Sequence, residues 1–135
     1  MSYSQEIAVV AVVSGASVGV DVEYDHNDEV WSEVGKLIVS DVDERPDKMV
    51  KSWTAKEAAA KETGLGLDLP LGAVVLESVR HNAARAKISH AKTQRSLWIT
   101  WFEIEGGYVG AVASDSDLPV QVVEERGNPT TRWFE

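Results

Sequence analysis

The segment Trp53-Thr54-Ala55-Lys56-Glu57-Ala58-Ala59-Ala60-Lys61 decides the fold, because it predicts the central helix of the chain. It is rich in alanine, contains no glycine or proline, and is soon followed by Gly64, a natural helix stop. Residues four apart share one face of a helix, so Trp53, Glu57 and Lys61 form a stripe. If that stripe is partly buried, its charges are paired or bind something, since burying an isolated charge is costly. The alternative is a solvated charged face.

A second motif lies upstream, where residues 18–23 alternate as a β-strand does. Asp21 and Glu23 project to the same side of such a strand, opposite the valines. Two neighbouring carboxylates repel each other unless a cation lies between them. Oxygen ligands at this spacing suit Mg²⁺, which typically takes one or two carboxylates together with substrate phosphate.

Together the two motifs resemble the signature of the 4′-phosphopantetheinyl transferases. That family is marked by a G-[IV]-D-[IV]-E strand, followed by a helix reading W-x-x-K-E-x-x-x-K. Here the strand motif is Gly19-Val20-Asp21-Val22-Glu23, and the helix motif spans 53–61. Residues 64–71 are close to the G-x-G-L-x-L-P-L segment that follows the helix in the two-domain members. The resemblance covers nearly the whole chain, from about Ser2 to Ser114, and it corresponds to the second half of a two-domain enzyme.

The resemblance implies Mg²⁺-dependent transfer of 4′-phosphopantetheine from coenzyme A to a serine of an acyl or peptidyl carrier protein. Asp21, Glu23 and Glu57 would hold Mg²⁺ together with the pyrophosphate of coenzyme A. Glu57 would take the proton of the carrier serine. Lys61 would stabilise the leaving phosphate oxygens, and Lys56 would also hold phosphate. We therefore expect the three carboxylates to converge where the helix crosses the strand.

Tyr3 stands where two-domain members usually carry the histidine of a Ser-His-Ser sequence, which contacts coenzyme A phosphate. We therefore include Tyr3 among the candidate cofactor-binding residues, although a tyrosine carries no positive charge near neutral pH. This departure favours an alternative, in which the chain is a non-catalytic relative that acts as a binding or assembly module without coenzyme A. A third possibility is a Mg²⁺-dependent enzyme that acts on another phosphorylated ligand.

The order of the elements predicts an α+β domain, with an antiparallel sheet of about five strands and the Trp53 helix packed across it. We expect a buried strand at 7–13 and further strands at 18–23, 74–79, 84–89, 96–104 and 108–113. Helices are expected near 28–38 and 47–63. Gly64 would end the second helix, and Gly106-Gly107 would form a hairpin turn.

The composition fits one globular domain, with 135 residues and a hydrophobic content of 44%. No apolar run reaches the roughly 20 residues that span a bilayer, and the N-terminus lacks the basic region of a signal peptide. The chain has no cysteine, so it forms no disulfide or thiolate metal site. These features predict a cytoplasmic protein. A net charge of −9 argues against nucleic acid and anionic membranes as partners.

We divide the chain into a transferase-like domain at 1–114 and a polar tail at 115–135, in which Trp133 and Phe134 would anchor the tail on this chain or a neighbour. Half of a two-domain enzyme leaves an incomplete cleft and an exposed sheet edge, which natural proteins avoid. We therefore expect a homo-oligomer, a dimer or a trimer, or a domain of a larger synthase.

The carrier protein is not identified by the sequence. One basic cluster could attract an acidic carrier, and it comprises Arg80, Arg85, Lys87, Lys92 and Arg95.

Overall fold

A computed structural model of the chain describes residues 1–4, 7–25 and 28–124. Our expectations for the tail beyond residue 124, including Trp133 and Phe134, lie outside the described residues. The helices are α1 (Asp28–Ile38) and α2 (Met49–Thr63), and two short 3₁₀ turns follow, η1 (Gly66–Asp68) and η2 (Leu71–Ala73). The strands are β1 (Ser2–Ser4), β2 (Ile7–Val9), β3 (Val18–Tyr24), β4 (Val74–Glu77), β5 (Ala83–His90), β6 (Thr93–Ile104) and β7 (Tyr108–Ser114).

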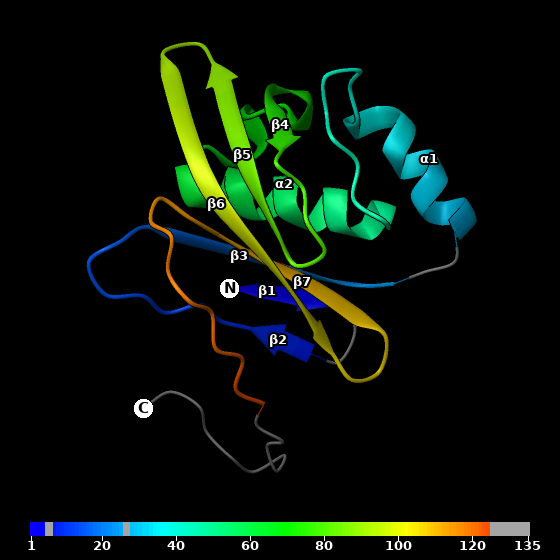
Figure 1. The fold of residues 1–135 in the computed structure, drawn as a ribbon, viewed down its shortest axis with the longest axis vertical. Helices are drawn as coiled ribbons and strands as arrows, with labels where there is room; N and C mark the ends of the chain where they lie inside the picture. Colours follow the sequence, from blue (N-terminus) through cyan, green and yellow to red (C-terminus); the bar gives the residue numbers. More distant parts are fainter. Residues whose placement is uncertain (5–6, 26–27, 125–135) are drawn as a thin grey trace.

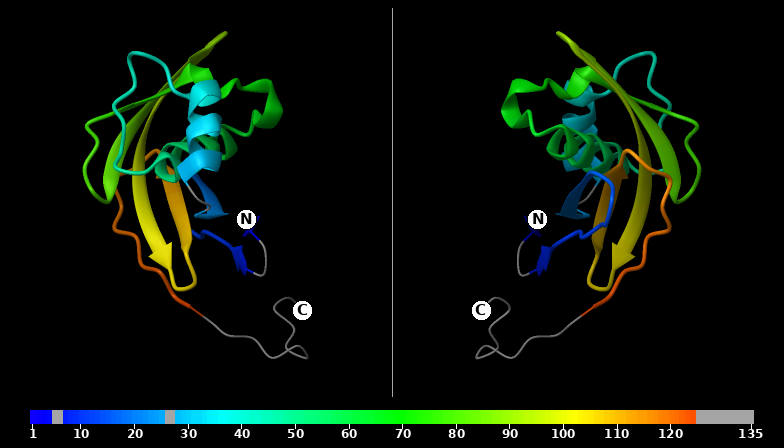
Figure 2. Two further views of the ribbon diagram at one scale, coloured as in Figure 1. Left: turned by 90° about the vertical axis from the view of Figure 1, so that its right-hand side faces the viewer. Right: turned by 90° about the vertical axis from the view of Figure 1, so that its left-hand side faces the viewer.

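Five of the strands form one antiparallel sheet in the order β3-β7-β6-β5-β4. Helix α2 crosses one face of this sheet (Figure 1). Figure 2 shows α1 on the same side as α2. The predicted α+β architecture is therefore confirmed. Gly64 caps α2 in the left-handed conformation, with its N–H on Lys61 O at 3.2 Å, and Gly106 and Gly107 turn the β6–β7 hairpin with positive φ.

Small residues let α2 approach the sheet closely. Ala55, Ala58 and Ala59 are fully buried in the core that α2 forms with the sheet. At Gly19 of β3, an added Cβ would lie 2.2 Å from Ala58 O and 2.5 Å from Glu62 N. Both are backbone atoms of α2, so neither can rotate out of the way. The glycine of the strand motif is therefore required by the contact between β3 and α2.

β1 covers the free edge of β3 through side chains. The Oγ atoms of Ser2 and Ser4 accept the N–H groups of Val22 and Tyr24, at 3.1 and 3.0 Å. The main chain of β1 instead pairs with β2 in a separate two-stranded sheet. This arrangement satisfies edge donors that would otherwise lack partners.

The prediction of a buried strand at 7–13 is wrong. β2 ends at Val9, and Val10 and Val12 are 60% and 91% exposed. The apolar, β-branched composition of this run predicted burial, but β2 pairs with β1 and does not enter the five-stranded sheet. The rest of the run therefore has no sheet face against which to pack.

The face of the sheet that points away from α2 is partly covered. Trp98 and Phe102 of β6 are half-buried on this face. Phe102 fills the space above Gly110 of β7, where a Cβ would come within 2.2 Å of its ring. The guanidinium of Arg85 stacks on Trp98 at 3.7 Å from the ring centroid. Both faces of β6 thus carry large side chains.

A membrane-spanning helix is absent from the described ranges, since neither α1 nor α2 is long and apolar enough to cross a bilayer.

Lys56, which the resemblance assigned to phosphate, is fully buried within the fold. Its Nζ donates to Ile38 O at 2.7 Å and to Asp43 Oδ2 at 2.8 Å. Asp43 also accepts the N–H groups of Ser40 and Leu76, each at 2.8 Å. Burial alone would raise the pKa of Asp43, but its bonds from Lys56, Ser40 and Leu76 hold that pKa below the ordinary value. The pair therefore ties α2 to the end of α1 and to β4.

The first prediction concerns the contact between β3 and α2. Gly19→Ala should lower the free energy of unfolding by about 1–3 kcal/mol or more, because the new methyl group meets backbone rather than a flexible side chain. Chemical denaturation followed by circular dichroism measures this. Gly72→Ala is the matched control, since a Cβ at Gly72 meets no atom within 4 Å. Equal stability of the two variants would contradict the account.

The second prediction concerns the buried ion pair. Lys56→Met leaves Asp43 buried without its cation, so the free energy of unfolding should fall by about 3–5 kcal/mol at neutral pH. Lys87→Met breaks the exposed pair with Glu77, whose atoms lie 3.4 Å apart, and should cost less than about 1 kcal/mol. Urea denaturation compares the two variants, and similar costs would count against a structural role for Lys56.

The same pair predicts how stability depends on pH. Because the pKa of Asp43 is lowered in the folded state, its contribution is fully present above the ordinary value of 3.8. That contribution is lost as the pH falls through the folded-state pKa. In Lys56→Met the pKa of Asp43 rises, so acid does not remove a stabilising contribution from this variant. The difference in the free energy of unfolding between the wild-type chain and Lys56→Met should therefore become smaller below the folded-state pKa of Asp43. A gap that stays constant between neutral and acid pH would contradict the assignment.

Candidate functional site

Asp21 lies at the centre of the candidate site, on the side of β3 that faces α2. Lys61 Nζ of α2 and Ser2 Oγ of β1 both donate to its Oδ1, at 2.9 and 3.0 Å. Its Oδ2 is buried and has no hydrogen-bond partner among the described residues. Burial raises the pKa of Asp21, although the bonds from Lys61 and Ser2 lower it in part. One oxygen of this carboxylate is therefore fixed and the other is unsatisfied.

Glu23 lies two residues further along β3, on the same side. Its Oε1 accepts a hydrogen bond from Trp53 Nε1 of α2 at 3.2 Å. Burial raises the pKa of Glu23, and the neighbouring charges of Asp21 and Glu57 raise it further. The strand motif and the first residue of the helix motif are thus in direct contact.

Glu57 supplies the third carboxylate, from α2. It is half-buried, and its side chain makes no hydrogen bond or ion pair with another described residue. Burial and the charge of Asp21 raise its pKa, whereas Lys61 lowers it. Its oxygens are therefore available to a ligand or a proton.

The structure brings together four of the predicted site residues, namely Asp21, Glu23, Glu57 and Lys61. It does not bring Lys56 to them, because the ammonium group of Lys56 is fully buried against Asp43. Tyr3 lies in β1, opposite Ala8 of β2. Its role toward coenzyme A remains a prediction from its position in the sequence.

Among the described residues, no group of three or more acidic or histidine side chains is placed to hold a metal ion. Asp21, Glu23 and Glu57 therefore do not converge into a ready metal site, and Lys61 and Trp53 each hold an oxygen of one of these carboxylates. The donor chemistry nevertheless fits a hard cation such as Mg²⁺. A buried carboxylate oxygen without a partner is costly in an apolar setting, and a cation would remove that cost.

The sequence did not reveal two of the contacts at this site. Ser2 reaches Asp21 from a different strand, and the indole of Trp53 donates a hydrogen bond to Glu23. The alternation Ser-x-Ser at 2–4 is the signal for the first contact, since it places two hydroxyls on one side of a strand. Nothing in the sequence pairs that strand with Asp21.

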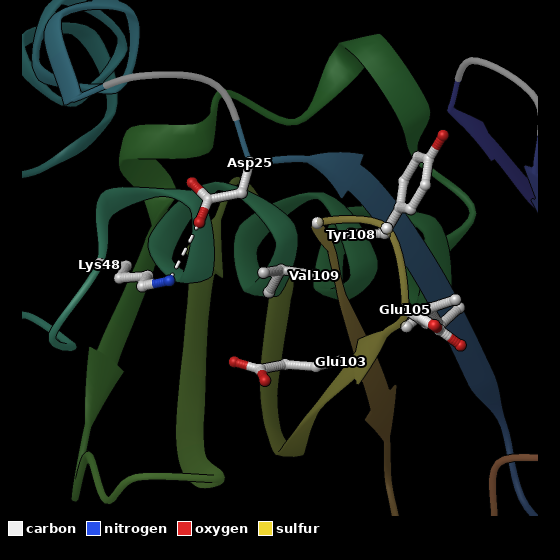
Figure 3. A pocket seen from close by; sticks show the side chains of 9 residues that line it. Asp25, Lys48, Glu103, Glu105, Tyr108 and Val109 are labelled. Atoms are coloured by element: carbon white, nitrogen blue, oxygen red, sulfur yellow. Dashed lines mark hydrogen bonds and ion pairs between the residues drawn. The ribbon is translucent and has the colours of Figure 1, made fainter.

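A pocket of about 320 Å³ lies elsewhere, at the β6–β7 hairpin. Figure 3 shows its side chains, with Lys48 paired to Asp25 at 3.0 Å and Glu103 and Glu105 also at its wall. None of Asp21, Glu23, Glu57 and Lys61 lines it. Its carboxylates outnumber its single lysine, so it is unsuited to phosphate groups. We therefore place the candidate site at the carboxylate cluster and not in this pocket.

Two of the five cations in the basic cluster expected to attract a carrier protein are paired with carboxylates. Arg95 binds Glu62 of α2, and Lys87 pairs with Glu77. Arg85 stacks on Trp98 and donates to Ser96 Oγ at 2.7 Å. Three of its five cations thus have partners within the fold, which weakens the case for this cluster as a docking surface.

Comparison with known proteins supports the resemblance. The family described as the 4′-phosphopantetheinyl transferase superfamily matches residues 17–113. This range contains the strand motif at 19–23 and the helix motif at 53–61. The 4′-phosphopantetheinyl transferase Sfp of Bacillus subtilis (strain 168) is 32% identical over 93 residues, which cover 67% of this chain and 40% of that protein. The chain therefore spans less than half the length of this relative. The matched range and the position of its acidic residues show that the chain belongs to the 4′-phosphopantetheinyl transferase superfamily.

Proposed function

We propose that this chain transfers 4′-phosphopantetheine from coenzyme A to a serine of an acyl or peptidyl carrier protein, with Mg²⁺ held by Asp21, Glu23 and Glu57. The observation that carries the proposal is the buried Oδ2 of Asp21, which has no partner among the described residues, beside two glutamates whose pKa values are raised by burial and by the charge of Asp21. When bound there, Mg²⁺ would neutralise negative charge on the pyrophosphate of coenzyme A.

Glu57 is the residue that we assign as general base. It makes no internal bond that would have to break before it accepts a proton, and its raised pKa makes it a better base than an exposed glutamate. As Glu57 takes the proton, the serine oxygen bonds to the phosphorus that carries the pantetheine arm. The bond from that phosphorus to the oxygen of the adenosine phosphate breaks, and adenosine 3′,5′-bisphosphate leaves.

Lys61 is the residue that we assign to the phosphate oxygens. Its side chain is 37% exposed, so its ammonium group can reach a ligand while remaining close to Asp21. A cation at this position stabilises charge that develops on the leaving oxygens. We assign this role to Lys61 alone and treat Lys56 as a structural residue, because its ammonium group is fully buried against Asp43.

A second candidate is a non-catalytic relative that has lost coenzyme A. Tyr3 at the position of the family's histidine favours it. Isothermal titration of the chain with coenzyme A and Mg²⁺ separates the two candidates. Heat of binding supports the transferase, whereas absence of binding with an intact fold supports the binding module.

The third prediction tests the assigned base. Glu57→Gln keeps the size of the side chain but removes the charge, so transfer to a carrier protein should fall by about 10²–10⁴-fold. Mass spectrometry of the carrier after incubation with coenzyme A and Mg²⁺ measures it. The melting temperature without metal should not fall, because the carboxylate of Glu57 forms no bond within the described fold and its charge is repelled by Asp21.

Glu33→Gln serves as the control for this experiment, since Glu33 pairs with Lys36 on the exposed side of α1, outside the carboxylate cluster. Its transfer rate should equal that of the wild-type chain. Undiminished transfer by Glu57→Gln would remove Glu57 as the base. A fall in melting temperature together with activity would indicate a structural role instead.

The fourth prediction concerns assembly, and it belongs to the same proposal. Half-buried Trp98 and Phe102 on the outer face of the sheet support an oligomer. Light scattering at micromolar concentration should give a mass of at least two chains, against 14.7 kDa for one. A stable monomer that still transfers phosphopantetheine would contradict this prediction of an oligomer.

We also propose a cytoplasmic location for the protein, as the sequence predicts.

A further inference from the structure

We propose that Ser2 is a positioning residue for Asp21, whose hydroxyl holds the carboxylate so that Oδ2 stays available to a metal ion. This inference rests on the proposed function, because it assigns a role to Ser2 at the same site. Ser2 belongs to neither of the two sequence motifs, and it reaches the site from β1.

The hydrogen bonds of Ser2 determine where its proton points. Ser2 is 4% exposed. Its Oγ accepts the N–H of Val22 at 3.1 Å and lies 3.0 Å from Asp21 Oδ1. A hydroxyl has one proton, and an ionised carboxylate can only accept, so the proton of Ser2 is directed to Asp21. Ser2 thus links the main chain of β3 to the carboxylate of the preceding residue.

Two donors on one oxygen fix the orientation of the Asp21 carboxylate. Lys61 Nζ donates to the same Oδ1 at 2.9 Å, while Oδ2 has no partner among the described residues. Lys61 has an exposed side chain that can turn to a phosphate group, but Ser2 is buried and held by the backbone of β3. Ser2 therefore keeps Asp21 in place when Lys61 binds a substrate.

Ser4 provides a matched control in the same strand. Its Oγ accepts the N–H of Tyr24 at 3.0 Å, just as Ser2 accepts that of Val22. It makes no bond to a carboxylate of the described residues. Loss of either hydroxyl removes one bond between β1 and the edge of β3, but loss of Ser2 alone releases Asp21.

The test measures Mn²⁺ binding to the full chain by the electron paramagnetic resonance signal of free Mn²⁺. In Ser2→Ala the Kd for Mn²⁺ should rise by about 10-fold or more, the usual effect of removing a residue that orients a metal ligand. Ser4→Ala should bind Mn²⁺ as the wild-type chain does. Ser2→Thr retains the hydroxyl and should restore binding. Thermal melting of each variant establishes that it is folded.

The outcomes distinguish this inference from the proposed function. Mn²⁺ binding by Ser2→Ala equal to that of the wild-type chain would overturn the inference alone. Equal weakening in Ser2→Ala and Ser4→Ala would also overturn it, because it would show that docking of β1 is what matters. A wild-type chain that binds no Mn²⁺ would overturn the inference together with the metal part of the proposed function.

Discussion

The close contact between α2 and β3 is the constraint on which the rest of the structure depends. A Cβ at Gly19 would lie 2.2 Å from Ala58 O, so the strand and the helix are separated by backbone and small side chains alone. Polar side chains on the facing sides of β3 and α2 are therefore held close to one another. This is why Asp21 of the strand and Lys61 of the helix meet at 2.9 Å, and why Glu57 lies within the electrostatic influence of Asp21.

The site is costly to the fold when no cation is bound. Burial raises the pKa values of Asp21, Glu23 and Glu57, and repulsion between them adds to this, so ionising these groups weakens the folded state as the pH rises above their ordinary values. The packing of the α2 alanines and the buried pair between Lys56 and Asp43 offset that cost. Functional sites commonly trade stability for chemistry in this way.

Much of the fold could be predicted from the sequence, because its signals are local. Alanine-rich composition indicates α2, Gly64 indicates its end, and Gly106-Gly107 indicates the last hairpin, each without knowledge of distant contacts. The strand at 7–13 was wrong because apolar composition does not reveal which strand a segment will pair with. The residues of the site were predicted by family resemblance, but the buried partner of Lys56 and the bond from Ser2 to Asp21 depend on contacts between distant segments.

The most direct test of the account is a crystal structure of the chain with coenzyme A and Mn²⁺, in which anomalous scattering locates the metal. We expect an anomalous peak bonded to Asp21 Oδ2, the oxygen that has no partner among the described residues. Glu57 should lie at the same metal, with Lys61 turned toward phosphate. Bound coenzyme A with no peak at Asp21, or with a peak at other residues, would contradict the central claim.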